Sequence, residues 1–161
     1  MTPTDNFSEI KQEILDRARR AKACRPEYGR AYAAEDMQRL CTVIKDNFNW
    51  CCRNGVIDAP LLEKYKSDFA ACDIYVNTDA ERGFLLCDGN ATVTAYGNAK
   101  VRAWNNAKVE AYGNATVRAW NSAYCSSWSL IECKLSDNAL YRVRSTNTVY
   151  YANDNLKFVK Q

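Results

Sequence analysis

The sequence predicts an α+β protein in which an N-terminal cap of three helices packs on a β-solenoid of eight-residue repeats. Two observations support this prediction. Apolar residues recur at helical spacing through the first 70 residues, and residues 89–128 repeat with a fixed period of eight. We therefore expect two parts, a helical cap at 1–70 and a β-solenoid at 71–161.

Three helices are expected in the N-terminal part. The first spans about 4–22, where apolar residues form one stripe. A connector at 24–32 contains proline and glycine. The second helix spans about 34–53 and ends at an Asn-Gly pair, which is a typical helix stop. The third spans about 59–70, and Asp58 precedes it as the N-cap.

The repeat consists of five octads with one shared pattern. They read GNATVTAY, GNAKVRAW, NNAKVEAY, GNATVRAW and NSAYCSSW. Small apolar residues alternate with polar ones in each octad, which indicates a strand because successive side chains point to opposite faces. Gly-Asn or Asn-Asn follows Tyr96, Trp104 and Tyr112, and these residue types tolerate the left-handed backbone of a corner. Each octad is therefore expected to form one strand and one corner.

Two folds could be built from such strands, an antiparallel meander of hairpins and a β-solenoid. Near-identical repeats favour the solenoid, because each coil must present the same surface to the next. The aromatic residue alternates between tyrosine and tryptophan from Tyr96 to Trp120, a period of 16 that predicts two octads per coil. A three-sided coil of 24 residues is the alternative, and handedness is not predicted.

Asparagine also recurs at the corners. Asn98, Asn106 and Asn114, with Asn90 at the start, are expected to form a hydrogen-bonded ladder along the stack. The ladder is interpreted as structural.

The two ends of the solenoid are expected to differ from its middle. The chain changes to strand at 73–76, and the helical cap is expected to cover the unpaired edge of the first coil. Larger residues enter after Trp128, as expected for terminal coils that must close themselves. Residues 156–159 are predicted to form a last edge strand.

Composition limits the classes of function. The chain has 161 residues, of which 47% are hydrophobic and 12% aromatic, and this excludes general disorder. A net charge of +3 is too small to imply nucleic acid or a membrane by itself. No apolar run is long enough to span a membrane, so no membrane partner is expected. The N-terminal segment lacks the pattern of a signal peptide, and we expect a cytoplasmic protein.

The chain contains eight cysteines and no histidine. No cysteines have the C-x-x-C spacing, so no metal site and no cofactor are predicted. The cysteines are interpreted as reduced and structural, with Cys87, Cys125 and Cys133 at inward positions. The missing histidine excludes Ser-His and Cys-His catalysis. Acidic residues between 73 and 88 are interpreted as solvated loop carboxylates, and no enzyme activity is expected.

Several short motifs invite comparison with a known family. They are Ala23-Cys24, Tyr28-Gly29, Asn49-Trp50-Cys51-Cys52, Asn54-Gly55 and Gly89-Asn90-Ala91. Over most of its length the chain resembles a family of uncharacterised small proteins from gut anaerobes and their phages, in which a helical part precedes Gly-Asn-Ala repeats. The resemblance implies an accessory protein of a mobile element, of the kind that binds or sequesters a host defence factor. It brings no established activity and no functional residues.

The preferred hypothesis is a non-catalytic protein that binds a protein partner. Trp, Tyr and Arg are enriched at binding hot spots, and the octads carry such residues at outward positions. The candidate binding residues are Lys100, Arg102, Trp104, Arg118, Trp120 and Trp128. The structural alternative is that each corner aromatic packs on its neighbour one coil away and holds the stack.

Nucleic-acid binding is the alternative function. Lys100, Arg102, Lys108 and Arg118 outnumber the one acid, Glu110, and they alternate with aromatic residues. Single-strand binders combine a basic groove with such stacking platforms. A homo-oligomer is expected in either case, and a dimer is its simplest closed form.

Overall fold

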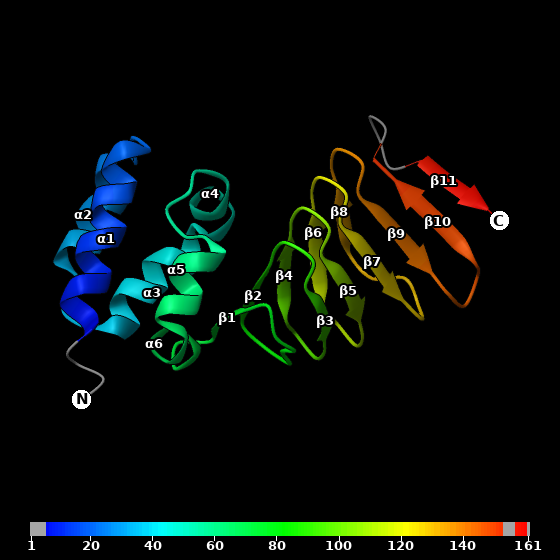
Figure 1. The fold of residues 1–161 in the computed structure, drawn as a ribbon, viewed down its shortest axis with the longest axis horizontal. Helices are drawn as coiled ribbons and strands as arrows, with labels where there is room; N and C mark the ends of the chain where they lie inside the picture. The colour runs from blue at the N-terminus through cyan, green and yellow to red at the C-terminus, as the bar shows by residue number, and fades with distance from the viewer. Residues whose placement is uncertain (1–5, 153–156, 161) are drawn as a thin grey trace. The chain divides into compact units, whose positions relative to one another are not determined.

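A computed structural model describes residues 6–152 and 157–160 of the chain. The chain forms two compact units that divide between Ile74 and Tyr75. The first unit is helical and the second is a β-solenoid (Figure 1). The predicted α+β class is therefore confirmed.

The helical unit has six helices among its described residues, and the prediction of three is wrong. The helices are α1 Phe7–Arg20, α2 Arg25–Ala33, α3 Met37–Asp46, α4 Phe48–Arg53, α5 Ala59–Lys64 and α6 Lys66–Ala70. The expected connector at 24–32 is mostly α2, because its proline lies in the first turn, where a helix does not need the missing N–H. No helix in the described part of the chain is both long and apolar enough to cross a membrane.

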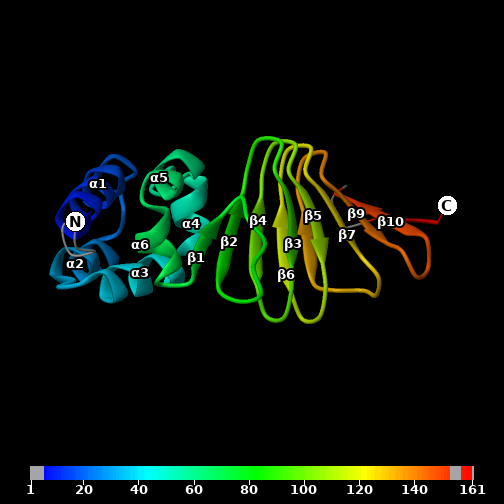
Figure 2. The same cartoon turned by 60° about the horizontal axis from the view of Figure 1, so that its bottom comes forward.

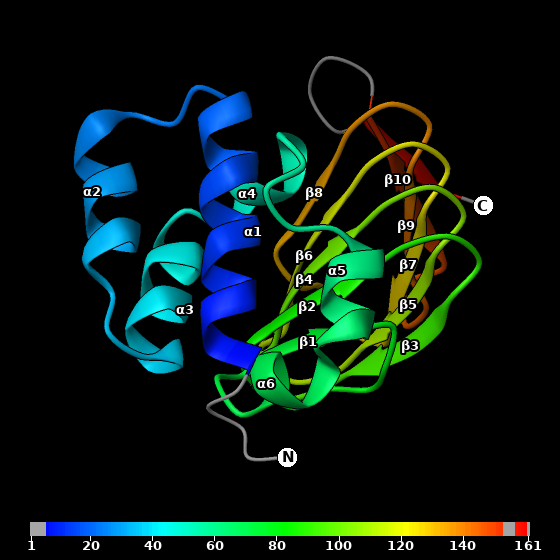
Figure 3. The ribbon, with the colours of Figure 1, turned by 60° about the vertical axis from the view of Figure 1, so that its left-hand side comes forward.

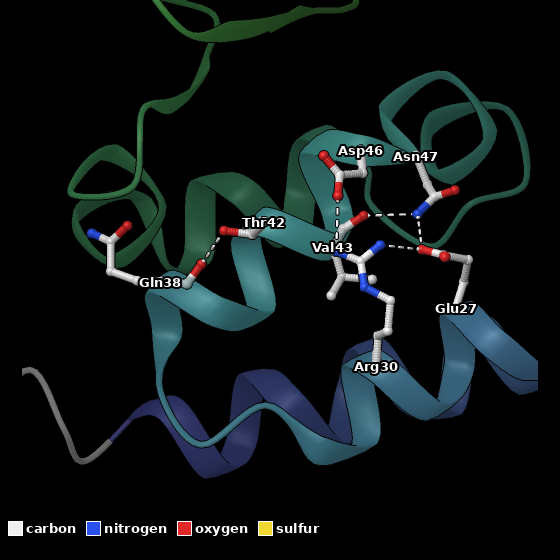
Figure 4. Close-up of polar contacts among 7 residues, drawn as sticks. All are labelled: Glu27, Arg30, Gln38, Thr42, Val43, Asp46 and Asn47. Atoms are coloured by element: carbon white, nitrogen blue, oxygen red, sulfur yellow. Dashed lines mark hydrogen bonds and ion pairs between the residues drawn. The ribbon is translucent and has the colours of Figure 1, made fainter.

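The helix expected at 34–53 is divided at Asn47 into α3 and α4. Asn47 leaves helical geometry, with φ −122° and ψ 29°. Its Nδ2 donates to the Val43 carbonyl at 2.9 Å and to Glu27 Oε2 at 2.7 Å (Figure 4). Arg30 bridges Glu27 and Asp46 at 2.8 Å each. The break therefore lies where side chains of α2 bind the end of α3.

The helix expected at 59–70 is divided at Tyr65 into α5 and α6. Tyr65 has φ −117° and ψ 40°, and its ring is buried. The Tyr65 hydroxyl donates to Glu9 Oε2 on α1 at 3.2 Å. Asp58 is the N-cap of α5, as predicted, since its Oδ1 accepts from the Leu61 N–H at 3.0 Å.

The second unit is built from short strands in two sheets. The strands are β1 Ile74–Val76, β2 Phe84–Cys87, β3 Thr92–Ala95, β4 Lys100–Ala103, β5 Lys108–Ala111, β6 Thr116–Ala119, β7 Tyr124–Ser127, β8 Cys133–Leu135, β9 Leu140–Val143, β10 Thr148–Tyr151 and β11 Lys157–Lys160. One sheet has the order β1-β2-β4-β6-β8, and the other has the order β11-β10-β9-β7-β5-β3. Successive coils stack side by side (Figure 2).

Each coil contains two octads, as predicted. The parallel pairs align residues 16 apart, such as Val93 with Val109 and Val101 with Val117. These valines and the flanking alanines are buried and form a thin core between the sheets. Figure 3 shows each coil as a flattened loop with one sheet along each long side. The small side chains are needed because the two sheets face each other directly across the coil.

The corner ladder lies one position earlier in the octad than predicted. Asn105, Asn121 and Asp137 have left-handed backbones, with φ of 56°, 55° and 56°. The Asn105 N–H donates to Asn121 Oδ1 at 3.1 Å, and the Asn121 N–H donates to Asp137 Oδ2 at 3.0 Å. The side chains of Asn98, Asn106 and Asn114 are exposed and take no part in this ladder. The side chain of the residue with positive φ makes this contact along the stack, whereas the residue after it contributes its backbone N–H, as Asn106 does to the Gly89 carbonyl at 2.9 Å.

The opposite corner uses glycine at the same octad position. Gly97 and Gly113 have φ of 53° and 62° and stack directly on one another. A Cβ at Gly97 would lie 2.5 Å from the Glu81 carbonyl oxygen. This corner therefore needs glycine for space as well as for backbone conformation.

The last coil closes differently from the others. After β9 the chain turns back, and β10 pairs with β9 antiparallel instead of crossing to the other sheet. Tyr141 takes the inward place of Cys125 one coil later, and its hydroxyl bonds Ser127 Oγ and accepts from the Ile131 N–H at 3.0 Å. The predicted edge strand at 156–159 corresponds to β11, although residue 156 lies outside the described residues.

We predict that Gly97→Ala destabilises the protein more than Gly89→Ala. Both glycines have positive φ, but only Gly97 lacks room for a Cβ, since nothing lies within 4 Å of the corresponding point at Gly89. The control should cost about 1 kcal/mol for backbone strain alone, and Gly97→Ala about 2–4 kcal/mol because of added overlap. Urea unfolding measures both. Equal losses would contradict the tight stacking at this corner.

Candidate functional site

The sequence-predicted binding residues fall into three places on the solenoid. Lys100, Arg102 and Arg118 lie on the outer side of β4 and β6 in the five-stranded sheet. Trp104 and Trp120 lie at the corner that follows these two strands. Trp128 follows β7 of the six-stranded sheet, at the opposite edge of the coil. The six residues therefore do not form one surface.

The basic residues of the five-stranded sheet form a column. Arg102, Arg118 and Lys134 are aligned one coil apart. Arg102 is only 8% exposed, and its Nη1 donates to the Val101 carbonyl at 3.0 Å. Lys100 places its Nζ 5.0 Å from the centroid of the Phe84 ring, which is a cation–π contact. Arg102 is thus withdrawn from the surface, whereas Lys100 and Lys134 are exposed.

Trp104 and Trp120 stack on each other. Their ring centroids are 4.4 Å apart, and the planes differ by 6°. Both side chains are half-buried. This is the arrangement expected if a corner aromatic packs on its neighbour one coil away, so these two residues stabilise the stack.

The opposite edge of the coil carries a row of exposed apolar side chains. Tyr96, Tyr112 and Trp128 occupy the same place in successive coils and are 45%, 39% and 61% exposed. Leu130, two residues beyond Trp128, is 66% exposed. The rings of Tyr96 and Tyr112 stack at 5.6 Å with an interplanar angle of 14°. We call these four residues the aromatic edge.

A hydrogen-bonded cluster holds the middle of the aromatic edge. The Tyr112 hydroxyl donates to Glu110 Oε1, and this hydrogen bond raises the pKa of the phenol. Arg144 Nη1 lies 3.3 Å from the same carboxylate oxygen and donates to Ser126 Oγ at 3.0 Å. The ring of Tyr112 is therefore held in one orientation at the surface.

Sequence reasoning missed most of the aromatic edge. Only Trp128 was among the expected binding residues, whereas Tyr96 and Tyr112 were not. The period of 16 contained the signal, because it places Tyr96, Tyr112 and Trp128 in one column. Leu130 could be found by noting that Ser129-Leu130 replaces the Gly-Asn corner of the earlier coils.

The acidic residues before the octads hold turns. Asp79 Oδ1 accepts from the Thr94 N–H at 2.7 Å. Asp88 Oδ1 accepts from the Gly89 N–H at 2.7 Å and from the Asn105 side chain. These two carboxylates are hydrogen-bonded to the backbone or the corner ladder, and Asp79 is also exposed to solvent, so they are loop acids that hold turns in addition to being accessible to water.

The cysteines are free thiols, and most are buried. Cys87, Cys125 and Cys133 lie inside the solenoid, at the inward positions that were predicted. A hydrogen bond with Cys133, together with burial, raises the pKa of the Cys125 thiol. Burial also raises the pKa of Cys51 to about 12. In the described ranges, no group of three or more Cys, Asp or Glu side chains is placed to hold a metal ion.

The helical unit contains a groove of about 740 Å³ between α1 and α5. Glu9, Glu13, Arg17, Lys64 and Tyr65 contribute to its lining. Arg17 pairs with Glu13 at 2.8 Å and with Asp58 at 2.9 Å. Arg17 pairs with Glu13, and Tyr65 donates to Glu9, so these polar groups of the groove already have partners and the aromatic edge is the stronger candidate site.

Comparison of the chain with protein-family models, curated proteins and solved structures finds no match.

We predict that Trp104→Ala lowers stability and that Trp128→Ala does not. Removing Trp104 deletes one ring of a stack at 4.4 Å, which should cost about 2 kcal/mol for a half-buried aromatic. Trp128 is mostly exposed and makes no such stack among the described residues, so its loss should change stability by less than about 0.5 kcal/mol. Thermal and urea unfolding of both variants measure this. A stability loss at Trp128 equal to that at Trp104 would contradict the distinction between the two edges.

We further predict that Cys24 and Cys51 differ in their rate of alkylation. Cys24 is exposed, whereas Cys51 is buried and its pKa is about 12. At pH 8 roughly one Cys51 thiol in ten thousand is then a thiolate, the reactive form. Iodoacetamide should alkylate Cys24 in the native chain and Cys51 only after unfolding. Peptide mass spectrometry measures both modifications. Similar rates in the native chain would show that Cys51 is not buried.

Proposed function

We propose that this chain is a non-catalytic binding protein whose aromatic edge contacts a protein partner. The observation that supports this is the clustering of exposed apolar side chains. Seven large apolar side chains are exposed among the described residues, and four of them form the aromatic edge. Exposed apolar side chains that recur along one edge are typical of a protein interaction site, whereas single exposed apolar residues are ordinary.

The rigidity of the aromatic edge also supports binding. Tyr96 stacks on Tyr112, and Tyr112 is bonded to Glu110, which pairs with Arg144. Side chains that are already ordered lose little conformational entropy when a partner binds. Tyrosine and tryptophan contribute large contact areas, and such residues dominate binding hot spots.

The charge of the aromatic edge favours a protein partner over a polyanion. Glu110 and Arg144 pair at 3.3 Å, so this part of the edge has no net charge. Apolar side chains beside a paired polar cluster match the apolar core and polar rim of a protein–protein interface. The resemblance to phage and gut-anaerobe proteins supports a further step. In this proposal the chain is a mobile-element accessory protein that acts in the cytoplasm, as a homo-oligomer, and sequesters a host factor.

The nucleic-acid alternative has less support. It requires Lys100, Arg102, Lys108 and Arg118 to act together. Lys108 lies on β5 in the six-stranded sheet, whereas the other three lie on the five-stranded sheet. Arg102 is also withdrawn from the surface. These residues do not line one basic groove of the kind that tracks a phosphate backbone.

The test is native mass spectrometry of the tagged chain purified from its own cells, compared with a Trp128→Ala/Leu130→Ser variant. We expect a protein to co-purify with the wild type and its affinity for the variant to be about 30-fold weaker, the effect of losing a hot spot worth about 2 kcal/mol. Leu140→Ser is the matched control, because Leu140 is exposed outside the aromatic edge. Retention of the partner by the double variant, or its loss from the control alone, would overturn the proposal. A salt-sensitive oligonucleotide as the retained ligand would favour the alternative.

A further inference from the structure

At the C-terminal end of the solenoid, the six-stranded sheet extends beyond the five-stranded sheet. The five-stranded sheet stops at β8, while the six-stranded sheet continues through β9, β10 and β11. Figure 1 shows β10 and β11 continuing past the last complete coil. We call β10 and β11 the overhang. One face of the overhang therefore has no opposing sheet strand among the described residues.

The edge of β8 has backbone groups available for pairing. The Glu132 carbonyl accepts from the Val117 N–H at 3.0 Å, and the Ser136 N–H donates to the Ala119 carbonyl at 2.9 Å, so both point toward β6. Because backbone groups alternate along a strand, those of Leu135 point away from β6. No described strand lies on that side of β8. An unpaired edge of this kind is a template for another strand.

Apolar side chains are incompletely covered at the same end. Tyr150 on β10 stacks on Tyr141 at 5.7 Å with an interplanar angle of 19°. Tyr150, Ile131 and Leu135 pack against the solenoid core but are only partly buried. Thr148 on β10 is 1% exposed, so the uncovered apolar surface at this end is confined to parts of Tyr150, Ile131 and Leu135.

We propose that a second copy of this chain closes this end, with the overhang of each copy filling the gap in the other. A two-fold axis that lies between the sheets and parallel to the strands exchanges the two sheets. The six-stranded sheet of one copy then continues into the five-stranded sheet of its partner. The edge of β8 meets the edge of the partner's β11, and this junction occurs twice.

The lengths of the sheets make this fit self-complementary. Each copy has a short sheet and a sheet with an overhang, so exchanging the sheets places every overhang opposite a gap. Within one copy β8 and β11 run in opposite directions, and the axis preserves strand direction. β8 and the partner's β11 are therefore antiparallel, which is an ordinary pairing. All the free edges at this end are then paired, and Tyr150 and Leu135 are covered.

Direct pairing of β8 with the partner's β8 is excluded by the same geometry. Antiparallel pairing of identical edge strands requires an axis perpendicular to the sheet. That axis leaves both six-stranded sheets in one layer, where the two overhangs would occupy the same space. The structure therefore selects the β8–β11 junction over the β8–β8 one.

This inference specifies the homo-oligomer of the proposed function, and it does not rest on the aromatic edge. It is tested with two proline variants of the full chain, measured by sedimentation velocity. Leu135→Pro removes the N–H at the free edge of β8 without breaking a bond to β6, and Leu135→Ala is its matched control. Val159→Pro prevents β11 from pairing. Circular dichroism verifies that each variant is folded.

We expect the wild type and Leu135→Ala to sediment as dimers and each proline variant alone as a monomer. An equimolar mixture of the two proline variants should form a dimer again, because the intact β11 of one can pair with the intact β8 of the other. This recovery is specific to a β8–β11 junction. A monomeric wild type, a dimeric Leu135→Pro or Val159→Pro, or a mixture that stays monomeric would overturn the inference. None of these results would alter the role of Trp128, which the partner-capture experiment tests separately.

Discussion

The backbone hydrogen bonds between successive coils, which align residues 16 positions apart, are the constraint on which the solenoid depends. They continue through the corners, where the Lys108 N–H donates to the Ala91 carbonyl at 2.8 Å and the Tyr124 N–H to the Ala107 carbonyl at 2.9 Å. Because 16 is even, an inward residue stays inward in every coil. Each position of the octad pair therefore forms a column. Inward columns repeat small apolar residues, such as Val93 and Val109, whereas outward columns can mix residue types, as Thr94 and Glu110 show.

The same register makes the two edges of the coil different surfaces. The eighth octad position alternates between the edges, so tryptophan recurs on one and tyrosine on the other until Trp128. Trp104 and Trp120 stack at 4.4 Å and are half-buried. The tyrosine column is more exposed, and it ends in Trp128, where the repeat loses its Gly-Asn corner. Binding is thus proposed for the aromatic edge, where the repeat changes at Trp128 and Leu130. These two residues depart from the octad pattern, so they are not needed to hold the stack.

Much of the solenoid could be predicted from the sequence because its contacts repeat at a fixed spacing. The coil length follows from the alternation of tyrosine and tryptophan, and the buried cysteines follow from their octad positions. The helix breaks at Asn47 and Tyr65 could not be predicted, because they depend on Glu27 and Glu9, which are distant in sequence. The corner ladder was placed one residue late because Gly-Asn and Asn-Asn do not show by themselves which residue has positive φ. The candidate binding residues lie in separate places for a related reason. A sequence period predicts which residues share a column, but it does not predict how exposed they are, and Arg102 is buried.

The most direct test of the division between a packed and an exposed aromatic edge is ¹⁹F NMR of the chain labelled with 5-fluorotryptophan. Single Trp→Phe variants would assign the four tryptophan resonances. We predict a large solvent isotope shift between H₂O and D₂O for Trp128 and small shifts for Trp104 and Trp120. Replacing Trp104 should also move the Trp120 resonance, since the two rings stack. A shielded Trp128 would contradict the proposed binding edge. Trp104 and Trp120 resonances that are fully exposed and independent of each other would contradict the stacking of these rings one coil apart.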